Sequence, residues 1–120
     1  MPSELRNKVV YYKHQGGGEP VKKFIDSLSK LQKAKVFNMF ALYQDFGLTS
    51  MIPHTKHLTG TPLWEIKIKG KDSIRMIYVS QTKTSILILH GFIKKTQKTP
   101  LNELKIALNR LRIWNSIHTQ

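Results

Sequence analysis

The residues from Leu63 to Lys69 alternate almost perfectly between apolar and polar side chains, and this alternation constrains the fold more than any other feature. The segment LWEIKIK repeats with a period of two, which is typical of a half-buried strand. A short turn containing Gly70 separates it from SIRMIYV, so the two segments are expected to form a β-hairpin. If Lys69 pairs with Ser73, the cross-strand pairs that face the core are Ile68 with Ile74, Ile66 with Met76, and Trp64 with Tyr78.

The same register places two cations opposite each other on the other face of the hairpin. Lys67 then lies across from Arg75, and like charges in this position cost stability. We therefore expect an anion or a carboxylate between them, and Glu65 on the same face is one such partner. Arg75 interrupts an otherwise apolar strand, so a buried ion pair with Glu65 is the structural alternative to a binding role.

The remaining elements can be placed from periodicity and turn residues. A strand is expected over residues 8–12, and helices are expected to begin at Pro20 and at the capping box of Ser29 and Gln32. The second helix, with Val36, Phe37, Phe40 and Tyr43 toward the core, should end before Gly47. Residues 48–62 are predicted to form a loop, residues 85–93 a strand in the middle of a covered sheet, and the segment after Thr99 and Pro100 a final helix.

The expected order is therefore strand, two helices, three strands and a helix (β-α-α-β-β-β-α). Separate runs of helices and strands are typical of an α+β domain with a mostly antiparallel sheet. A chain of 120 residues is sufficient for a single core, so residues 1–120 are expected to form one compact domain.

Charge restricts the partners. The chain carries 20 Lys and Arg against seven Asp and Glu, a net charge of +13, so nucleic acid is the leading expected partner and an acidic protein the next. It has no cysteine, which excludes disulfides, thiol catalysis and zinc sites built on Cys. No apolar run approaches the roughly 20 residues of a membrane span, and the N-terminus lacks a signal core, so the expected location is the cytoplasm, with no membrane partner.

The apolar strand over residues 85–93 ends in a group of cations, in the sequence LHGFIKKTQKTP. Its lysines Lys94 and Lys95 would be held rigidly at the edge of an anion site. His90 is a candidate proton-transfer group, although a lone His in a central strand is more often a hydrogen-bonded core residue. Phe92 is undecided between packing and stacking on a base. His54 and His57 have the spacing of a metal pair but no nearby acidic residue, so no metal site is expected.

Two segments together resemble a known family. LTGTPLWEIKIKGKDSIRMIYV and ILILHGFIKKTQKTPLNELKIAL are similar to the RelE/HigB-like toxins of type II toxin-antitoxin systems, in particular to their phage-derived or phage-related branch. The resemblance implies a RelE-like fold and a toxin, commonly an endoribonuclease that cleaves mRNA on the ribosome. It also implies a cognate antitoxin, expected to be a small helix-turn-helix protein.

The resemblance carries over to individual residues. The strand arginine of the family falls on Arg75, the arginine of its L-W-E-L-R motif on Lys67, and its paired lysines on Lys94 and Lys95. Lysine at position 67 keeps the charge but loses the two-pronged geometry of arginine, and the chain lacks the C-terminal tyrosine that RelE uses in catalysis.

These residues predict a site for RNA cleavage. RNA supplies its own nucleophile, the 2′-hydroxyl, so a clamp of cations needs neither a metal nor another cofactor. The predicted catalytic residues are Arg75, Lys67, Lys94 and Lys95, with Glu65 or His90 as alternative proton-transfer groups. Lys69, Lys98, Lys105 and Phe92 are predicted to bind RNA.

Three other functions stay open at this level. The chain could be a non-catalytic basic nucleic-acid-binding protein, such as a phage regulatory protein. It could also be a toxin with a different target, or a degenerate toxin kept for antitoxin binding.

Overall fold

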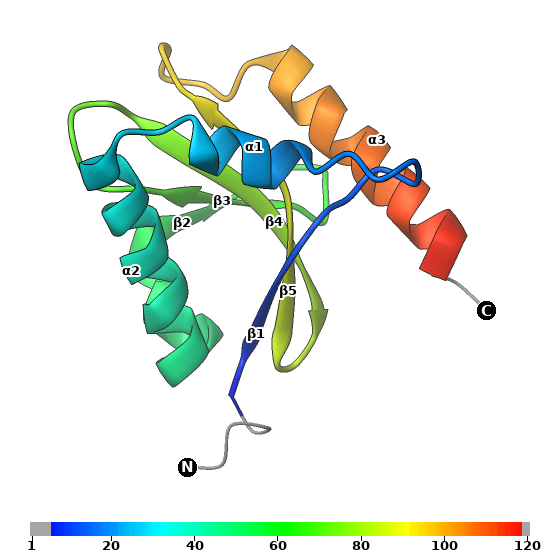
Figure 1. Ribbon diagram of the computed structural model, residues 1–120, viewed down its shortest axis with the longest axis horizontal. Helices are drawn as coiled ribbons and strands as arrows, with labels where there is room; N and C mark the ends of the chain where they lie inside the picture. The colour runs from blue at the N-terminus through cyan, green and yellow to red at the C-terminus, as the bar shows by residue number, and fades with distance from the viewer. Residues whose placement is uncertain (1–5, 119–120) are drawn as a thin grey trace.

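The computed structural model describes residues 6–118, which form a five-stranded sheet with helices on both faces (Figure 1). The strands lie in the order β1-β5-β4-β3-β2; β1 runs parallel to β5 and the other neighbours are antiparallel. This confirms the α+β fold class. The elements are β1 (Lys8–Tyr11), α1 (Pro20–Asp26), α2 (Lys30–Phe46), the 3-10 helix η2 (Leu48–His54), β2 (Thr55–His57), β3 (Trp64–Lys67), β4 (Ile74–Thr82), β5 (Ser85–Ile93) and α3 (Leu101–His118).

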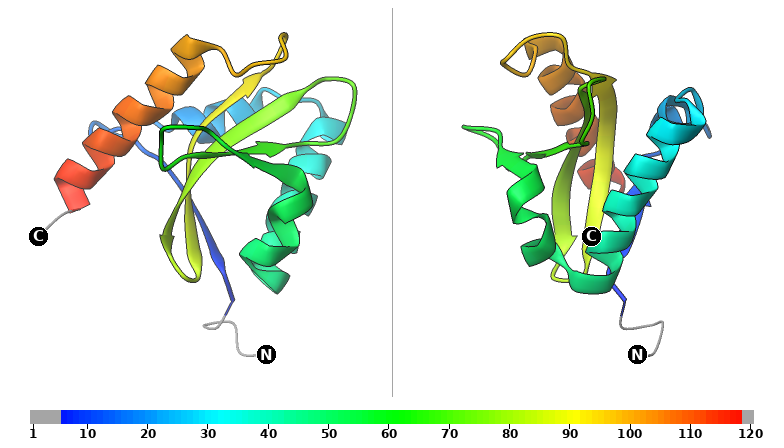
Figure 2. Two further views of the ribbon diagram at one scale, coloured as in Figure 1. Left: turned by 180° about the vertical axis from the view of Figure 1, so that it is seen from behind. Right: turned by 90° about the vertical axis from the view of Figure 1, so that its left-hand side faces the viewer.

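Two consecutive residues of β5 show how the helices divide between the faces. His90 contacts Glu103 of α3, whereas a Cβ at Gly91 would lie 2.4 Å from the ring of Phe24 in α1. Glycine is therefore required where α1 packs directly onto the sheet. The two views of Figure 2 show the same division, with α3 in front of the sheet when the molecule is seen from behind.

The predicted hairpin register is confirmed pair by pair. Trp64 pairs with Tyr78, Ile66 with Met76 and Lys67 with Arg75, and the amide of Ile68 donates to Ile74 at 3.0 Å. The expectation that Trp64 is a core residue is wrong, because the residue is 39% exposed and its ring lies tilted against that of His57. Alternation assigns a side chain to a face of the sheet, but β3 lies next to the edge, where that face is only partly covered.

The predicted loop over residues 48–62 contains two elements that periodicity did not reveal. Gly47 ends α2 with a φ of 80°, and η2 follows directly. The three-residue strand β2 then pairs antiparallel with β3 and forms one edge of the sheet. The observed order thus includes one strand more than the predicted β-α-α-β-β-β-α.

The helices follow their sequence signals closely. The predicted capping box is present, since the Ser29 side chain accepts from the Gln32 amide and the Gln32 side chain accepts from the Ser29 amide. Val36, Phe40 and Tyr43 are buried as expected, but Phe37 is 48% exposed, so its assignment to the core is wrong. No helix within residues 6–118 is long and apolar enough to cross a membrane.

Candidate active site

The Glu65 carboxylate lies at the centre of a buried polar cluster on the α3 side of the sheet. Its side chain is only 3% exposed. Its Oε1 atom is 3.4 Å from Nε of Arg75 and 3.2 Å from Nζ of Lys94, and its Oε2 atom accepts a short hydrogen bond from the Thr99 hydroxyl. One carboxylate thus holds two cations in fixed positions, because each contact restricts a long and otherwise mobile side chain.

Strand register accounts for this arrangement. Glu65 pairs with Ile77, and Arg75 pairs with both Lys67 on β3 and Phe92 on β5, so these side chains share one face. Lys94 follows Phe92 by two residues, and its amide donates to the Ser73 carbonyl at 2.8 Å, which extends the ladder past the end of β5. The period of two therefore brings Lys94 to the face on which Arg75 lies.

A pocket of about 280 Å³ opens beside this cluster. Four cationic side chains and one carboxylate line it, together with His54 and uncharged residues; we call it the cation pocket. Its cations outnumber its carboxylate, and one of them, Lys56, pairs with Glu65 across β2 and β3. Such a site favours an anion with several oxygen atoms, such as a phosphate diester. The residues that line it are Pro53, His54, Thr55, Lys56, Glu65, Lys67, Arg75, Lys94 and Gln97.

The surroundings of Lys94 lower the pKa of its ammonium group. Its side chain is 6% exposed, and this burial lowers its pKa from 10.5. Glu65 acts in the opposite direction, while Lys56 and Arg75 lower the pKa further. A lysine in such surroundings releases its proton more readily than a solvated one, which is the property required of a base or acid in proton transfer.

His90 belongs to a separate network beneath α3. Arg110 donates to its Nδ1 atom at 3.2 Å, so Nε2 carries the hydrogen and donates to Glu103 at 2.7 Å. The ring stacks on Phe92, and burial lowers the pKa of His90. His90 is therefore held as a neutral side chain that joins β5 to α3, and it does not line the cation pocket.

The residues that surround the cation pocket lie inside a segment that is similar to a known family. A family model described as Phage derived protein Gp49-like (DUF891) matches residues 23–112, which is most of the chain. The chain belongs to the Gp49-like family of phage-derived proteins. A search among curated proteins gave no match.

Within the Gp49-like segment, the structure brings together four of the six predicted catalytic residues. Glu65, Lys67, Arg75 and Lys94 line one pocket. Lys95 is exposed and does not line it, and His90 lies under α3. The two neighbouring lysines at the end of β5 therefore have different surroundings, although the sequence offered no reason to separate them.

The predicted RNA-binding residues are also divided. Lys98 and Lys105 are exposed, and Lys69 is exposed beside Lys35 and Met39 of α2, outside the cation pocket. Phe92 is 5% exposed and packs against His90, so it is a core residue and not a platform for a base.

Several residues of the site were missed. Lys56 and His54 belong to the segment predicted as a loop, so nothing placed them beside β3. Thr99 was used only to place the start of the final helix, but its hydroxyl donates to Glu65. The position of Thr99 directly before Pro100 gives no indication of this contact with a residue far away in the sequence. Among residues 6–118, no group of three or more His, Asp or Glu side chains is arranged to hold a metal ion.

Proposed function

We propose that this protein is the toxin of a type II toxin-antitoxin system, an endoribonuclease that cleaves mRNA on the ribosome in the cytoplasm. The observation that carries the proposal is the cation pocket, in which Lys56, Lys67, Arg75 and Lys94 surround a single buried carboxylate. Membership of the Gp49-like family and the resemblance of its hairpin and β5 segments to RelE and HigB toxins support it.

The proposed reaction uses the 2′-hydroxyl of the RNA as its nucleophile. This oxygen loses its proton and attacks the adjacent phosphorus, while the bond from phosphorus to the 5′ oxygen of the next nucleotide breaks. The products are a 2′,3′-cyclic phosphate and a 5′-hydroxyl, so no water is consumed in this step. RNA and the protein's own side chains supply every reacting group, and the proposal includes no metal or cofactor.

Each residue of the pocket has a role in this reaction. Arg75 offers a planar, permanently charged donor to the non-bridging oxygens, where negative charge develops. Lys94, with its lowered pKa, accepts the proton of the 2′-hydroxyl. Lys67, an exposed cation opposite Arg75, protonates the leaving 5′ oxygen. Glu65 is a positioning residue, because it orients Arg75 and Lys94 through one oxygen atom.

The antitoxin is expected to be a small helix-turn-helix protein. Its acidic or apolar residues would cover the face of the sheet on which Lys67 and Arg75 lie. A net charge of +13 favours a counter-charged partner. Occlusion of the cation pocket would explain inhibition directly. A complex that leaves Lys67 and Arg75 open to solvent would require inhibition by displacement of an element.

The test is cleavage of a defined mRNA in translating ribosomes by the purified protein, with the new ends analysed chemically. We expect cleavage in the presence of a metal chelator, and fragments that carry a 2′,3′-cyclic phosphate. Growth arrest on induction of the gene without a partner gene is the cellular counterpart. RNA binding without cleavage, from folded protein with ribosomes present, would contradict the proposal and favour a non-catalytic regulatory protein.

A further inference from the structure

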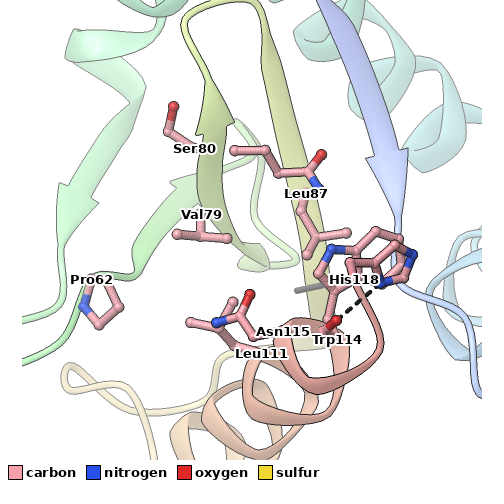
Figure 3. Close-up of a pocket in the computed structure, with 9 residues that line it drawn as sticks. Pro62, Val79, Ser80, Leu87, Leu111, Trp114, Asn115 and His118 are labelled. Atoms are coloured by element: carbon pink, nitrogen blue, oxygen red, sulfur yellow. Dashed lines mark hydrogen bonds between the residues drawn. The ribbon is translucent and has the colours of Figure 1, made fainter. Parts of the chain in front are cut away.

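A second pocket, of about 380 Å³, lies between the C-terminal half of α3 and the hairpin of β4 and β5 (Figure 3). Its apolar wall is formed by Pro62, Val79, Leu87, Leu111 and Trp114. We call it the aromatic pocket, because Trp114 and His118 form a stacked pair at its side, with ring centroids 3.9 Å apart and planes inclined by 15°. In Figure 3 the strand residues Val79 and Leu87 face the side chains of α3, with Pro62 opposite.

The chemistry of the aromatic pocket is the reverse of that of the cation pocket. None of the residues that line it in the described part of the chain is Lys, Arg, Asp or Glu, although the protein as a whole is strongly cationic. Its polar side chains are Ser80, Gln81, Asn115 and His118, and the Oε1 atom of Gln81 accepts from the Ser85 hydroxyl at 2.8 Å. Flat apolar and aromatic walls with amide groups at the rim suit a planar, uncharged heterocycle that carries donors and acceptors on its edge.

The hydrogen bonding of His118 adds an acceptor to this rim. Its Nδ1 atom is 2.9 Å from the carbonyl oxygen of Trp114, the contact marked by the dashed line in Figure 3. A carbonyl accepts only, so Nδ1 carries a hydrogen, and in the tautomer with a single hydrogen Nε2 keeps its lone pair. The exposed edge of the ring can therefore accept from an amino or imino group of a base.

The two pockets share one face of the sheet. Arg75 and Val79 are four residues apart on β4, and even spacing along a strand directs their side chains to the same side. Four strand residues span about 13 Å, whereas neighbouring nucleotides of a stacked strand are about 3.4 Å apart. An RNA strand with one phosphate in the cation pocket would therefore reach the aromatic pocket within a few nucleotides.

We infer that the aromatic pocket is a nucleobase subsite for the same RNA strand whose phosphate occupies the cation pocket. This inference rests on the proposed function for its choice of ligand. The segment matched by the Gp49-like family model ends before Trp114, Asn115 and His118, so the family match covers only part of this pocket. A base bound there would fix the register of the strand, and with it the phosphate that is cleaved.

The experiment uses the two tryptophans of the chain. In a Trp64→Phe background Trp114 is the single tryptophan, and its fluorescence is followed on titration with a 2′-O-methyl oligouridylate, which offers bases and phosphates but cannot be cleaved. An abasic oligonucleotide of equal length supplies the phosphates alone. We expect quenching of Trp114 by the first probe and none by the second at equal occupancy, because only a base contacts the aromatic pair.

Variants at the rim provide the second measurement. His118→Ala combined with Gln81→Ala should weaken binding of the base-bearing probe about tenfold, the scale of one lost base contact, and leave its salt dependence unchanged. Ile117→Ala is the matched control, since Ile117 is 42% exposed on the same helix and does not line the pocket. Thermal unfolding establishes that each variant is folded.

The outcomes separate this inference from the proposed reaction. If Trp114 is quenched only by the base-bearing probe but the protein never cleaves mRNA, the proposed reaction is contradicted and the nucleobase subsite is supported. Equal affinity of the rim variant and its parent for the base-bearing probe would overturn the subsite, as would equal quenching by the abasic probe. If the rim variant instead lost binding to the antitoxin alone, the pocket would be a protein-docking site and the inference would be wrong.

Discussion

At the scale of single residues, Glu65 determines what the site can do. The expected carboxylate partner of Arg75 is present, but it is buried, and its second cation is Lys94 and not Lys67. The buried ion pair of Arg75 with Glu65, the structural alternative from the sequence, is therefore present, and Arg75 also lines the cation pocket, so its role in binding stays a prediction. Removing either cation affects the orientation of the other, because both contact Oε1 of Glu65.

The neighbouring lysines at the end of β5 provide a matched pair for mutation. Lys94→Met should reduce single-turnover cleavage by about 100-fold or more, the usual scale for a proton-transfer residue, whereas Lys95→Met should retain most of the activity. The methionine side chain preserves length and apolar contact at both positions. Equal losses in the two variants would mean that cleavage depends on the charge of the segment and not on the geometry at Glu65.

The protonation of Lys94 gives a prediction with a defined direction. Lys56 is one of the charges that lower the pKa of Lys94, so Lys56→Gln should raise this pKa. A base acts when it is unprotonated, so the rising limb of the pH profile of kcat/KM should move to higher pH. Lys95→Gln is the control and should not move it. If the rising limb of the kcat/KM profile of Lys56→Gln stays in place or moves to lower pH, Lys94 is excluded as the base.

At the scale of secondary-structure elements, α3 contacts the sheet through hydrogen bonds of titratable side chains. His90 of β5 is bounded by Glu103 and Arg110 of α3 and by the ring of Phe92. Burial is the largest cause of its lowered pKa; the Arg110 charge acts in the same direction and Glu103 opposes both. The folded protein therefore favours the neutral ring, and the contact between β5 and α3 through His90 should weaken in acid.

The resulting pH dependence can be worked out by linkage. Below the ordinary His pKa of 6.5 the unfolded chain binds a proton that folded His90 does not, so the free energy of unfolding falls as the pH is lowered from 6.5 toward the folded pKa. Urea unfolding of the parent and of His90→Gln is measured above and below pH 6.5. The free energy of unfolding should decrease less in the variant than in the parent as the pH is lowered. His57→Gln, at an exposed ring, is the control, and an equal decrease in parent and His90→Gln would contradict the account.

The sequence predicted some elements far better than others, for physical reasons. The hairpin of β3 and β4 was predicted to the residue, because two periodic strands and a short turn leave few registers. The strand β2 was missed because three residues are too few to show a period, and its pairing depends on β3. The contacts of Lys56 and Thr99 with the site were missed for the same reason, since each depends on elements far apart in the chain.

At the scale of the whole molecule, charge should govern RNA binding. The affinity should fall steeply with salt concentration as counterions compete for the phosphates. Lys98→Ala and Lys105→Ala should each weaken binding modestly for all RNA sequences, and should lower the slope of log affinity against log salt by somewhat less than about one unit per lost contact. Filter binding or fluorescence anisotropy over a range of salt checks this, and an unchanged slope would place both lysines away from the RNA path.

The central claim is that Arg75 stabilises charge in the transition state of RNA cleavage. The Arg75→Ala variant leaves Glu65 with Lys94 and Thr99 as partners, so we expect a stability loss of about 1–3 kcal/mol and a folded protein. The Arg75→Lys variant should recover cleavage only in part, because an ammonium group lacks the planar two-pronged geometry.

The most direct measurement is single-turnover cleavage of ribosome-bound mRNA by Arg75→Ala, with thermal unfolding and RNA affinity determined on the same preparation. The account predicts a folded variant whose RNA affinity falls slightly and whose cleavage rate falls by about 100-fold or more, equivalent to about 3 kcal/mol or more of lost transition-state stabilisation. Cleavage at the parental rate by this folded variant would contradict the assignment of the cation pocket as the active site.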